Sequence, residues 1–265
     1  MFIENNKMTS LYSYIAIFNV AVFLSFSSGC TTVQRYWPSN ARLQNSAVRA
    51  LRHPGTWMPA VGSAAITLGG WDQEISDWAR EETPVFGSSQ SAQDNSDFFL
   101  SFAHYGMILS ALAVHSDSES YWLPMVKRLT WEHVGVQAAI TVRKPIKKIT
   151  DRNRPNGDPE SFPSGHSTRA FAYVGMTYRN IDALDLDPVW GYSAKFIETC
   201  FGYSTAWARV EAGAHYPTDV LAGAALANFV SLFIYDAFFE NDDNVDVHAI
   251  LYEKGGIVLS LQYSF

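Results

Sequence analysis

Long, mostly apolar segments dominate the chain, and each is interrupted by only a few polar or charged residues. This pattern predicts helices. The expected helices cover residues 98–114, 121–143, 167–178, 190–210 and 217–239. A segment rich in Ala and Gly, 57–70, precedes them, and a short amphipathic turn is expected over 73–80. The pattern therefore predicts an all-α fold over most of the chain.

Polar segments separate the expected helices. Residues 31–46 are typical of a tether, and residues 83–97, with many Ser, Gln and Asn, are typical of a loop. Pro145 indicates that the helix starting at residue 121 ends or kinks there, and a strongly basic stretch follows up to Arg154. Because there is no internal repeat and no interior linker, we expect residues 57–240 to form one domain.

The C-terminal residues follow a different pattern. Residues 257–265 alternate between apolar and polar positions, residues 245–252 alternate in part, and Gly255 and Gly256 lie between them. Alternation on both sides of a Gly-Gly turn predicts a β-hairpin. A terminal Phe after such a strand also resembles the last strand of an outer-membrane barrel, but one hairpin cannot close a barrel. We expect residues 241–265 to form a hairpin that packs as a flap on the helices.

The first residues indicate export. Residues 11–26 form an apolar run that is shorter than the roughly 20 residues of a membrane-spanning helix. Ser-Ser-Gly followed by Cys30 resembles the cleavage site of bacterial lipoproteins, where the Cys is acylated and becomes the first residue. We expect residues 1–29 to be a signal peptide and residues 30–56 a tether and lead-in. The alternatives are an ordinary secretory signal with an incidental Cys and a short uncleaved anchor.

Composition narrows the class of protein. The 265 residues are 48% apolar and 17% charged, which excludes a disordered chain, and two cysteines exclude a disulfide-stapled fold. The net charge of −7 lacks the basic footprint of a nucleic-acid-binding protein. The mean hydropathy of −0.05 lies between soluble and multi-span membrane proteins. We expect a helical bundle facing the bacterial periplasm and tethered by a lipid at Cys30, with the outer membrane favoured. An integral inner-membrane protein is the main alternative.

Three short motifs carry the candidate chemistry. They are Lys147 followed after six residues by Arg154-Pro155, then Pro163-Ser164-Gly165-His166, then Arg209, His215 and Asp219 with five and three residues between them. Taken singly, each motif is also typical of a basic surface, of a helix start with a surface His, or of a local His and Asp pair. Their joint order and spacing are far beyond coincidence.

Together these motifs resemble the type 2 phosphatidic acid phosphatase (PAP2) family, which is related to vanadium haloperoxidases and bacterial non-specific acid phosphatases. The resemblance implies a bundle of about six core helices. It implies that His215 is the nucleophile and forms a phosphohistidine, while Asp219 accepts the N–H of the other ring nitrogen. It implies that His166 is the general acid, which protonates the leaving alkoxide and later activates water.

The remaining motif residues suit phosphate binding. In phosphoryl transfer the transition state spreads negative charge over equatorial oxygens, so cations stabilise it. Lys147, Arg154 and Arg209 are the expected cations. The backbone N–H groups of Ser164 and Gly165 are expected to face the anion at a helix N-terminus. No metal or other cofactor is expected, because these motifs contain no His-Glu-x-x-His, Cys pair or Asp-x-Asp site.

Two departures from the family pattern are visible. Ala208 stands before Arg209, where the family has Ser, and only seven residues lie between Pro155 and Pro163. Outside the motifs, His104 lies in an apolar helix and is expected to be a core residue. Arg152 lies beside the first motif, and the sequence leaves open whether it contacts phosphate.

The leading hypothesis is a metal-independent phosphatase for phosphate or diphosphate monoesters, lipid-linked and outside the cytoplasm. The alternatives are a non-specific soluble acid phosphatase or phosphotransferase, a vanadium haloperoxidase, and a non-catalytic envelope protein. Lipid A, undecaprenyl diphosphate, phosphatidylglycerophosphate and phosphatidate all present the same reacting group, so the motifs do not choose among these lipids or a small phosphate ester. The oligomeric state is also left open.

Overall fold

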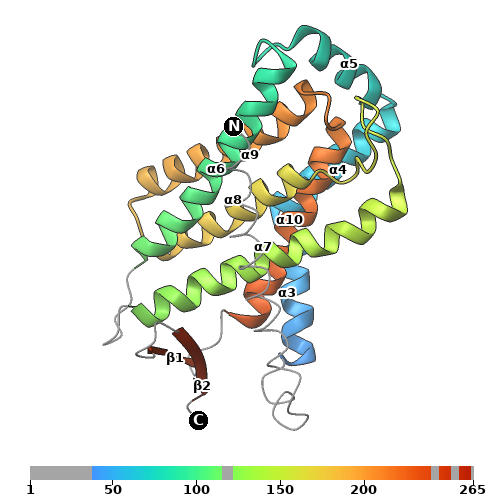
Figure 1. Cartoon of the computed structure of the whole chain (residues 1–265). Helices are drawn as coiled ribbons and strands as arrows, with labels where there is room; N and C mark the ends of the chain where they lie inside the picture. Colours follow the sequence, from blue (N-terminus) through green and yellow to red (C-terminus); the bar gives the residue numbers. More distant parts are fainter. Residues whose placement is uncertain (1–37, 115–121, 240–244, 252–256, 264–265) are drawn as a thin grey trace. The chain divides into compact units, whose positions relative to one another are not determined.

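The computed structural model describes residues 38–114, 122–239, 245–251 and 257–263. The expected signal peptide, Cys30, the first part of the tether and the turn of the hairpin lie outside these residues. Within the described ranges the elements are α3 (Asn40–Arg52), α4 (Pro54–Gly69), α5 (Asp72–Glu82), α6 (Ser89–Ala113), α7 (Trp122–Thr150), α8 (Gly165–Ala183), α9 (Pro188–Glu211), α10 (Pro217–Phe238), β1 (Val245–Leu251) and β2 (Ile257–Tyr263) (Figure 1). The predicted all-α fold is confirmed.

The bundle is arranged around α10. This helix packs against α4, α7 and α8, while α6 packs against α8 and α9. The core combines a few large side chains, such as Met107 and Met176, with fully buried small residues, such as Ala172, Ala224 and Ala227. Because small side chains allow helix backbones to approach closely, the Ala-rich stretch of α10 brings three neighbouring helices to its surface.

The start of α8 lies very close to α10. A Cβ added at Gly223 of α10 would lie 2.8 Å from the backbone oxygen of Ser164 and 3.2 Å from Oγ1 of Thr168. Ser167 Oγ also donates to the backbone oxygen of Val220 at 2.5 Å. The N-terminus of α8, which carries one of the three motifs, is therefore held directly against α10.

Two helices are longer than the sequence pattern predicts. α6 begins at Ser89, inside the expected loop 83–97, because Ser88 caps it by accepting from the N–H of Ser91 and because one side of its first turns, with Ala92 and Ser96, is fully buried. α7 continues through Pro145 to Thr150. Pro145 and Thr141 are both exposed, so water can satisfy the carbonyl that loses its helical donor there.

The expected tether is also partly helical. α3 starts at Asn40 and overlaps the end of the predicted polar segment. Its face with Ser46 and Ala50 is fully buried, and Arg49 Nε donates to Asp236 Oδ2 at 3.1 Å. This helix therefore forms because one face of a polar segment packs on the bundle, which composition alone does not indicate.

A glycine ends α4, and two short strands pair near the C-terminal end of the described residues. Gly70 has a φ of 69°, in the left-handed region, and caps α4 at the end of the segment rich in Ala and Gly. β1 and β2 pair antiparallel, with Val245 opposite Tyr263 and Leu251 opposite Ile257, which confirms the hairpin. Its packing as a flap on the helices stays a prediction.

One buried carboxylate places the start of α6. Glu211, at the end of α9, is fully buried and accepts from the backbone N–H groups of Val85 and Phe86 at 3.0 Å each. It also accepts from Trp207 Nε1 at 2.5 Å. The segment before α6 is thereby tied to α9, and the polar first turns of α6 are brought beside Arg209.

Among the described helices, only α10 (Pro217–Phe238) is long and apolar enough to cross a membrane by length and composition. The mean hydropathy of its most apolar window is 1.6, but 67% of that window is buried inside the bundle. A buried core helix of a soluble protein meets the same criterion.

The close contact at Gly223 gives a test of the fold. Gly223→Ala is expected to destabilise the protein by about 1–3 kcal/mol, because the added methyl group would press on backbone at Ser164 that cannot move freely. The measurement is the midpoint of thermal unfolding of the full chain. The matched control is Gly191→Ala in α9, whose Cβ would find its first neighbour, Ile181, only at 4.0 Å. This control should leave the midpoint unchanged or raise it, and an equal fall in both variants would contradict the packing argument.

Candidate active site

Five segments bring the three motifs to one end of the bundle. Lys147 lies near the end of α7, and Arg154 lies in the loop that follows. Ser164 is the residue before α8, where it occupies the N-cap position. Arg209 is in the last turn of α9, and Asp219 is in the first turn of α10. Each functional side chain therefore lies at or near a helix end, where the backbone leaves its spiral and side chains can converge.

Backbone hydrogen bonds join these segments. Ser164 N donates to the backbone oxygen of Asp219 at 2.9 Å, which ties the start of α8 to the start of α10. Asn156 N donates to the oxygen of Gly213 at 3.1 Å, which ties the loop of the first motif to the loop of the third. His215 N donates to the oxygen of Arg209 at 3.2 Å, so the chain folds back sharply between two residues of the third motif.

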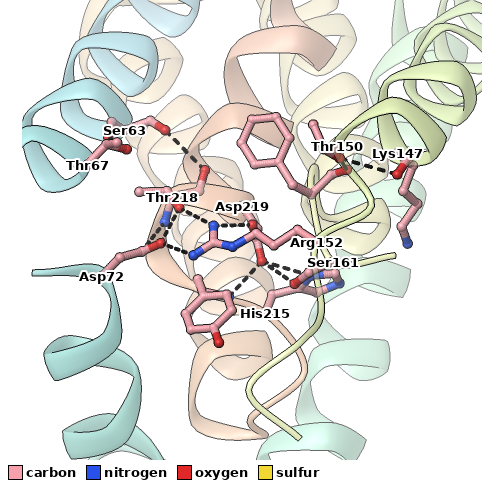
Figure 2. Close-up of polar contacts among 12 residues, drawn as sticks. Ser63, Thr67, Asp72, Lys147, Thr150, Arg152, Ser161, His215, Thr218 and Asp219 are labelled. Atoms are coloured by element: carbon pink, nitrogen blue, oxygen red, sulfur yellow. Dashed lines mark hydrogen bonds and ion pairs between the residues drawn. The ribbon is translucent and has the colours of Figure 1, made fainter. Parts of the chain in front are cut away.

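His215 is buried, with 2% of its surface exposed. Its Nδ1 lies 3.5 Å from Oδ2 of Asp219 and 3.5 Å from Oγ of Ser161 (Figure 2). Burial lowers the pKa of His215 to about 4; Asp219 acts in the opposite direction, and Arg209 and Arg154 lower the pKa further. The imidazole is therefore neutral at neutral pH. Its Nε2 has no hydrogen-bond partner among the described residues.

The carboxylate of Asp219 is completely buried and fully engaged. Its Oδ1 accepts from Arg152 Nη1 at 2.9 Å, and its Oδ2 accepts from Ser161 Oγ and, at 2.9 Å, from the backbone N–H of Tyr216. Burial alone would raise the pKa of Asp219, but contacts with His215, Ser161 and Arg152 outweigh burial and lower it. Asp219 therefore stays negatively charged beside His215.

Arg152 connects this carboxylate to a second one. Its Nη2 lies 2.5 Å from Oδ2 of Asp72, and its guanidinium stacks 3.9 Å from the ring centre of Tyr216. Asp72 also accepts from the backbone N–H of Thr218 at 2.9 Å and from its hydroxyl at 2.5 Å (Figure 2). The described partners of Arg152 are thus two carboxylates and a hydroxyl, and these contacts tie the start of α10 to Asp72 of α5.

Two of the three motif cations, Lys147 and Arg209, are desolvated. Lys147 is 8% exposed, and burial lowers its pKa to about 8, with Arg143 and Arg154 lowering it further. Arg209 is 5% exposed, and burial lowers its pKa to about 10. Arg209 Nη1 donates to Gln93 Oε1 at 2.5 Å and Ser96 Oγ at 3.3 Å, both on α6. Buried like charges destabilise one another unless an anion lies between them.

Several donors around these cations have no partner among the described residues. The hydroxyl of Ser164 is buried without a hydrogen bond, although Ser164 is the N-cap of α8. The Nε atoms of Arg154 and Arg209 are likewise buried and unpaired within the described ranges. Unsatisfied donors at a helix N-terminus, beside desolvated cations, form an arrangement that suits a phosphate group.

His166 lies in the first turn of α8, and its partner is a residue of α6. Its Nε2 is 2.8 Å from Oδ1 of Asp97. Burial lowers the pKa of His166 to about 4, Arg209 and Arg169 lower it further, and Asp97 acts in the opposite direction. In the free protein His166 is therefore neutral at neutral pH, and a bound anion would raise its pKa by offsetting the charges of the arginines.

Sequence reasoning missed four residues of this site. Asp72, Asp97 and Ser161 contact site residues but belong to no motif, and Asp97 was assigned to a loop. Arg143 lies against the start of α8, since a Cβ at Gly165 would be 2.7 Å from its Nη1. None of them carries a signal in the sequence. Cys30, the expected lipidation site, lies outside the described residues.

The structure also describes Ala208 and His104, which the sequence singled out. Ala208, which stands where the family pattern has Ser, is fully buried. His104 stacks on Tyr173 with ring centres 4.6 Å apart, as expected for a core residue. No group of three or more His, Cys, Asp or Glu side chains that could hold a metal ion occurs in the part of the chain that the structure describes.

Comparisons with known proteins agree with this arrangement. Residues 134–243 match the sequence profile of the PAP2 superfamily. No match was found among curated proteins. A solved structure, described as "the first transmembrane PAP2 type phosphatidylglycerolphosphate phosphatase from Bacillus subtilis", aligns with a TM-score of 0.51 and 18% identity, over 74% of this chain and 98% of that chain. At this identity the likeness shows the fold. The matched segment contains all three motifs, so the resemblance to the PAP2 superfamily covers the candidate site.

Proposed function

We propose that the protein is a phosphatase for lipid-linked phosphate or diphosphate monoesters, which acts through a phosphohistidine at His215. The observation that carries this proposal is the environment of His215. The ring is buried and neutral, a charged carboxylate faces its Nδ1, and Nε2 has no partner among the described residues. Desolvated cations and unpaired donors lie around it. A neutral nitrogen beside an anion-binding pocket suits nucleophilic attack on phosphorus.

In the first half of the proposed reaction, Nε2 of His215 bonds to phosphorus and the bond from phosphorus to the leaving oxygen breaks. The electron pair of that bond stays on the leaving oxygen, which takes a proton from His166. Lys147, Arg154 and Arg209 stabilise the charge on the equatorial oxygens. Asp219 stabilises the positive charge that develops on the ring of His215.

In the second half, water hydrolyses the phosphohistidine. His166, which has given up its proton, accepts a proton from the water as the oxygen attacks phosphorus. The bond between phosphorus and Nε2 breaks, its electron pair returns to His215, and inorganic phosphate leaves. The site is then in its starting state. His166 needs a proton in the first half, and a bound phosphate supplies the negative charge that raises its pKa.

Membrane association is part of the proposal, because large apolar side chains are exposed on the outer faces of three helices. Contiguous exposed apolar surface is unusual for a soluble monomer and is typical of a membrane or protein contact. The exposed residues are Trp57, Met58, Val61 and Leu68 of α4, Phe98, Phe102, Tyr105 and Leu109 of α6, and Val189, Trp190, Tyr192, Phe196, Ile197 and Tyr203 of α9. The solved structure with a similar fold is described as transmembrane. The lipid anchor at Cys30, the periplasmic side and the choice of membrane remain predictions from the sequence.

Replacing the nucleophile tests the mechanism directly. His215→Ala is expected to lower phosphate release from an aryl phosphate by at least about a thousandfold, because no other described side chain replaces Nε2. The wild-type protein, quenched during turnover, should hold acid-labile phosphate on His215. The control is His133→Ala in α7, whose Nδ1 contacts only the backbone oxygen of Leu129, at 2.7 Å. Full turnover by His215→Ala would overturn the mechanism.

The lowered pKa of Lys147 predicts how anion binding depends on pH. With a pKa of about 8, Lys147 is charged below that pH and loses its charge above it. The affinity for inorganic phosphate should therefore fall as the pH rises through about 8. In Lys147→Arg the side chain stays charged, so this fall should move to higher pH. Calorimetric titration between pH 6 and pH 10 gives the measurement, and identical profiles for both proteins would contradict the assignment.

The contact between Asp97 and His166 predicts a dependence on the leaving group. Asp97→Asn removes the charge that raises the pKa of His166, so His166 becomes a poorer acid donor in the bound complex. The turnover of an alkyl phosphate, which needs protonation, should fall by about tenfold or more, and that of a nitrophenyl phosphate should fall less. Asp94→Asn is the matched control, since Asp94 lies on the same helix and accepts from Gln90 at 2.9 Å. Equal losses on both esters would exclude this role for Asp97.

A further inference from the structure

Two arginines beside the phosphate site have no role in the proposed reaction. Arg143 lies one helical turn before Lys147 on α7, and Arg169 lies one turn after Gly165 on α8. A Cβ added at Gly165 would be 2.7 Å from Nη1 and 3.0 Å from Cζ of Arg143. The guanidinium of Arg143 therefore lies directly on the first residue of α8, and the lack of a side chain at Gly165 makes room for it.

Neither arginine contacts a counter-ion among the residues that the structure describes. Both side chains are half-buried, and neither has a hydrogen bond or ion pair with any residue that the structure describes. Nε of Arg143 is buried and unpaired within those residues. Burial lowers the pKa of Arg143, and so do the charges of Arg169 and Arg154, while Glu160 acts in the opposite direction without reversing the shift. Two half-buried cations that repel each other are stabilised when an anion binds between them.

The position of Arg169 indicates which part of a substrate the pair would meet. Arg169 lies three residues beyond His166 on α8, close enough for its charge to lower the pKa of that histidine. In the proposed reaction His166 protonates the leaving oxygen, so residues next to His166 face the leaving group. An alkyl leaving group has no charge to place there. A leaving phosphate does, and a planar guanidinium matches its oxygens.

We propose that Arg143 and Arg169 form a second anion subsite, which binds the inner phosphate of a diphosphate monoester while the terminal phosphate lies among Lys147, Arg154 and Arg209. This inference rests on the proposed function and narrows its substrate class to lipid diphosphates. His215 Nε2 bonds to the terminal phosphorus, and the bond to the bridging oxygen breaks. The bridging oxygen keeps the electron pair and takes the proton of His166, so the monophosphate of the lipid leaves. Water then converts the phosphohistidine to inorganic phosphate.

The test compares two esters with the same lipid tail. Initial rates of the full chain in detergent are measured with farnesyl diphosphate and with farnesyl phosphate, and the ratio of the two kcat/KM values is the readout. In Arg143→Gln and in Arg169→Gln this ratio should fall by about tenfold, because each variant loses a charge-assisted contact made only by the diphosphate. Lys144→Gln is the matched control: Lys144 is exposed and adjacent to Arg143, so its loss removes one charge without touching the subsite.

A ratio that stays at the wild-type value in both arginine variants would overturn the subsite. A ratio that falls equally in Lys144→Gln would also overturn it, because that result would show a general effect of surface charge. The ratio is interpreted only for a variant that is folded, which a midpoint of thermal unfolding close to that of wild type shows. One folded arginine variant is enough for the test, because each variant removes one member of the pair.

A binding measurement separates this inference from the proposed function. In the His215→Ala background, calorimetry is expected to show tighter binding of inorganic diphosphate than of inorganic phosphate, and Arg143→Gln should abolish that preference. If wild type cleaves neither ester but the preference depends on Arg143, the proposed function fails and the subsite stands. If wild type cleaves both esters and neither the ratio nor the preference depends on Arg143 or Arg169, the subsite fails and the proposed function stands.

Discussion

The site depends on one buried carboxylate, that of Asp219. The backbone oxygen of Asp219 accepts a hydrogen bond from Ser164 at the start of α8. Its side chain accepts from Arg152, from Ser161 and from the backbone N–H of the turn before α10. The same side chain faces Nδ1 of His215. Removing one partner of a buried ion pair leaves an uncompensated charge and is strongly destabilising, by about 3–5 kcal/mol. Asp219 therefore joins the stability of this end of the bundle to the orientation of the candidate nucleophile.

The second constraint is the crowding of positive charge. Lys147 and Arg209 are almost fully buried, and Arg143 and Arg154 lie close enough to lower the pKa of Lys147. Such a cluster is unfavourable in the free protein, and the helix N-terminus of α8 adds its own positive end. An anion that binds among these cations relieves their repulsion, and this relief contributes to the free energy of anion binding. The net charge of the whole chain, −7, is therefore no guide to the charge of this pocket, which is strongly positive.

Packing by small residues makes this crowding possible. Gly223 and the alanines of α10 let α8 approach so closely that the backbone of Ser164 meets the backbone of Asp219. On the other side, Glu211 ties the segment before α6 to α9, which brings Gln93, Ser96 and Asp97 beside Arg209 and His166. The polar contacts of the site thus follow from helix packing outside it.

The motifs alone were sufficient to recognise a resemblance to the PAP2 family, because the chemistry of phosphate binding requires particular residue types at particular spacings. Long apolar segments were likewise sufficient to predict an all-α fold, and alternation around a Gly-Gly pair was sufficient for the hairpin. Helix ends were less predictable. The start of α6 and all of α3 are polar in composition, and they are helical because capping and one-sided burial stabilise them, which a local pattern does not report.

Only the tertiary structure decided how the site is supported. Asp72 and Asp97 lie 147 and 122 residues before Asp219, and neither belongs to a motif. Only the fold brings Asp72 to Arg152 and Asp97 to His166. The same holds for Arg143, whose place against Gly165 depends on how α7 crosses α8. The sequence by itself determined which residues are candidates for the reacting groups, because their identities and spacings are local properties of the chain. The tertiary structure decided their charge states and partners, because burial and long-range contacts set both.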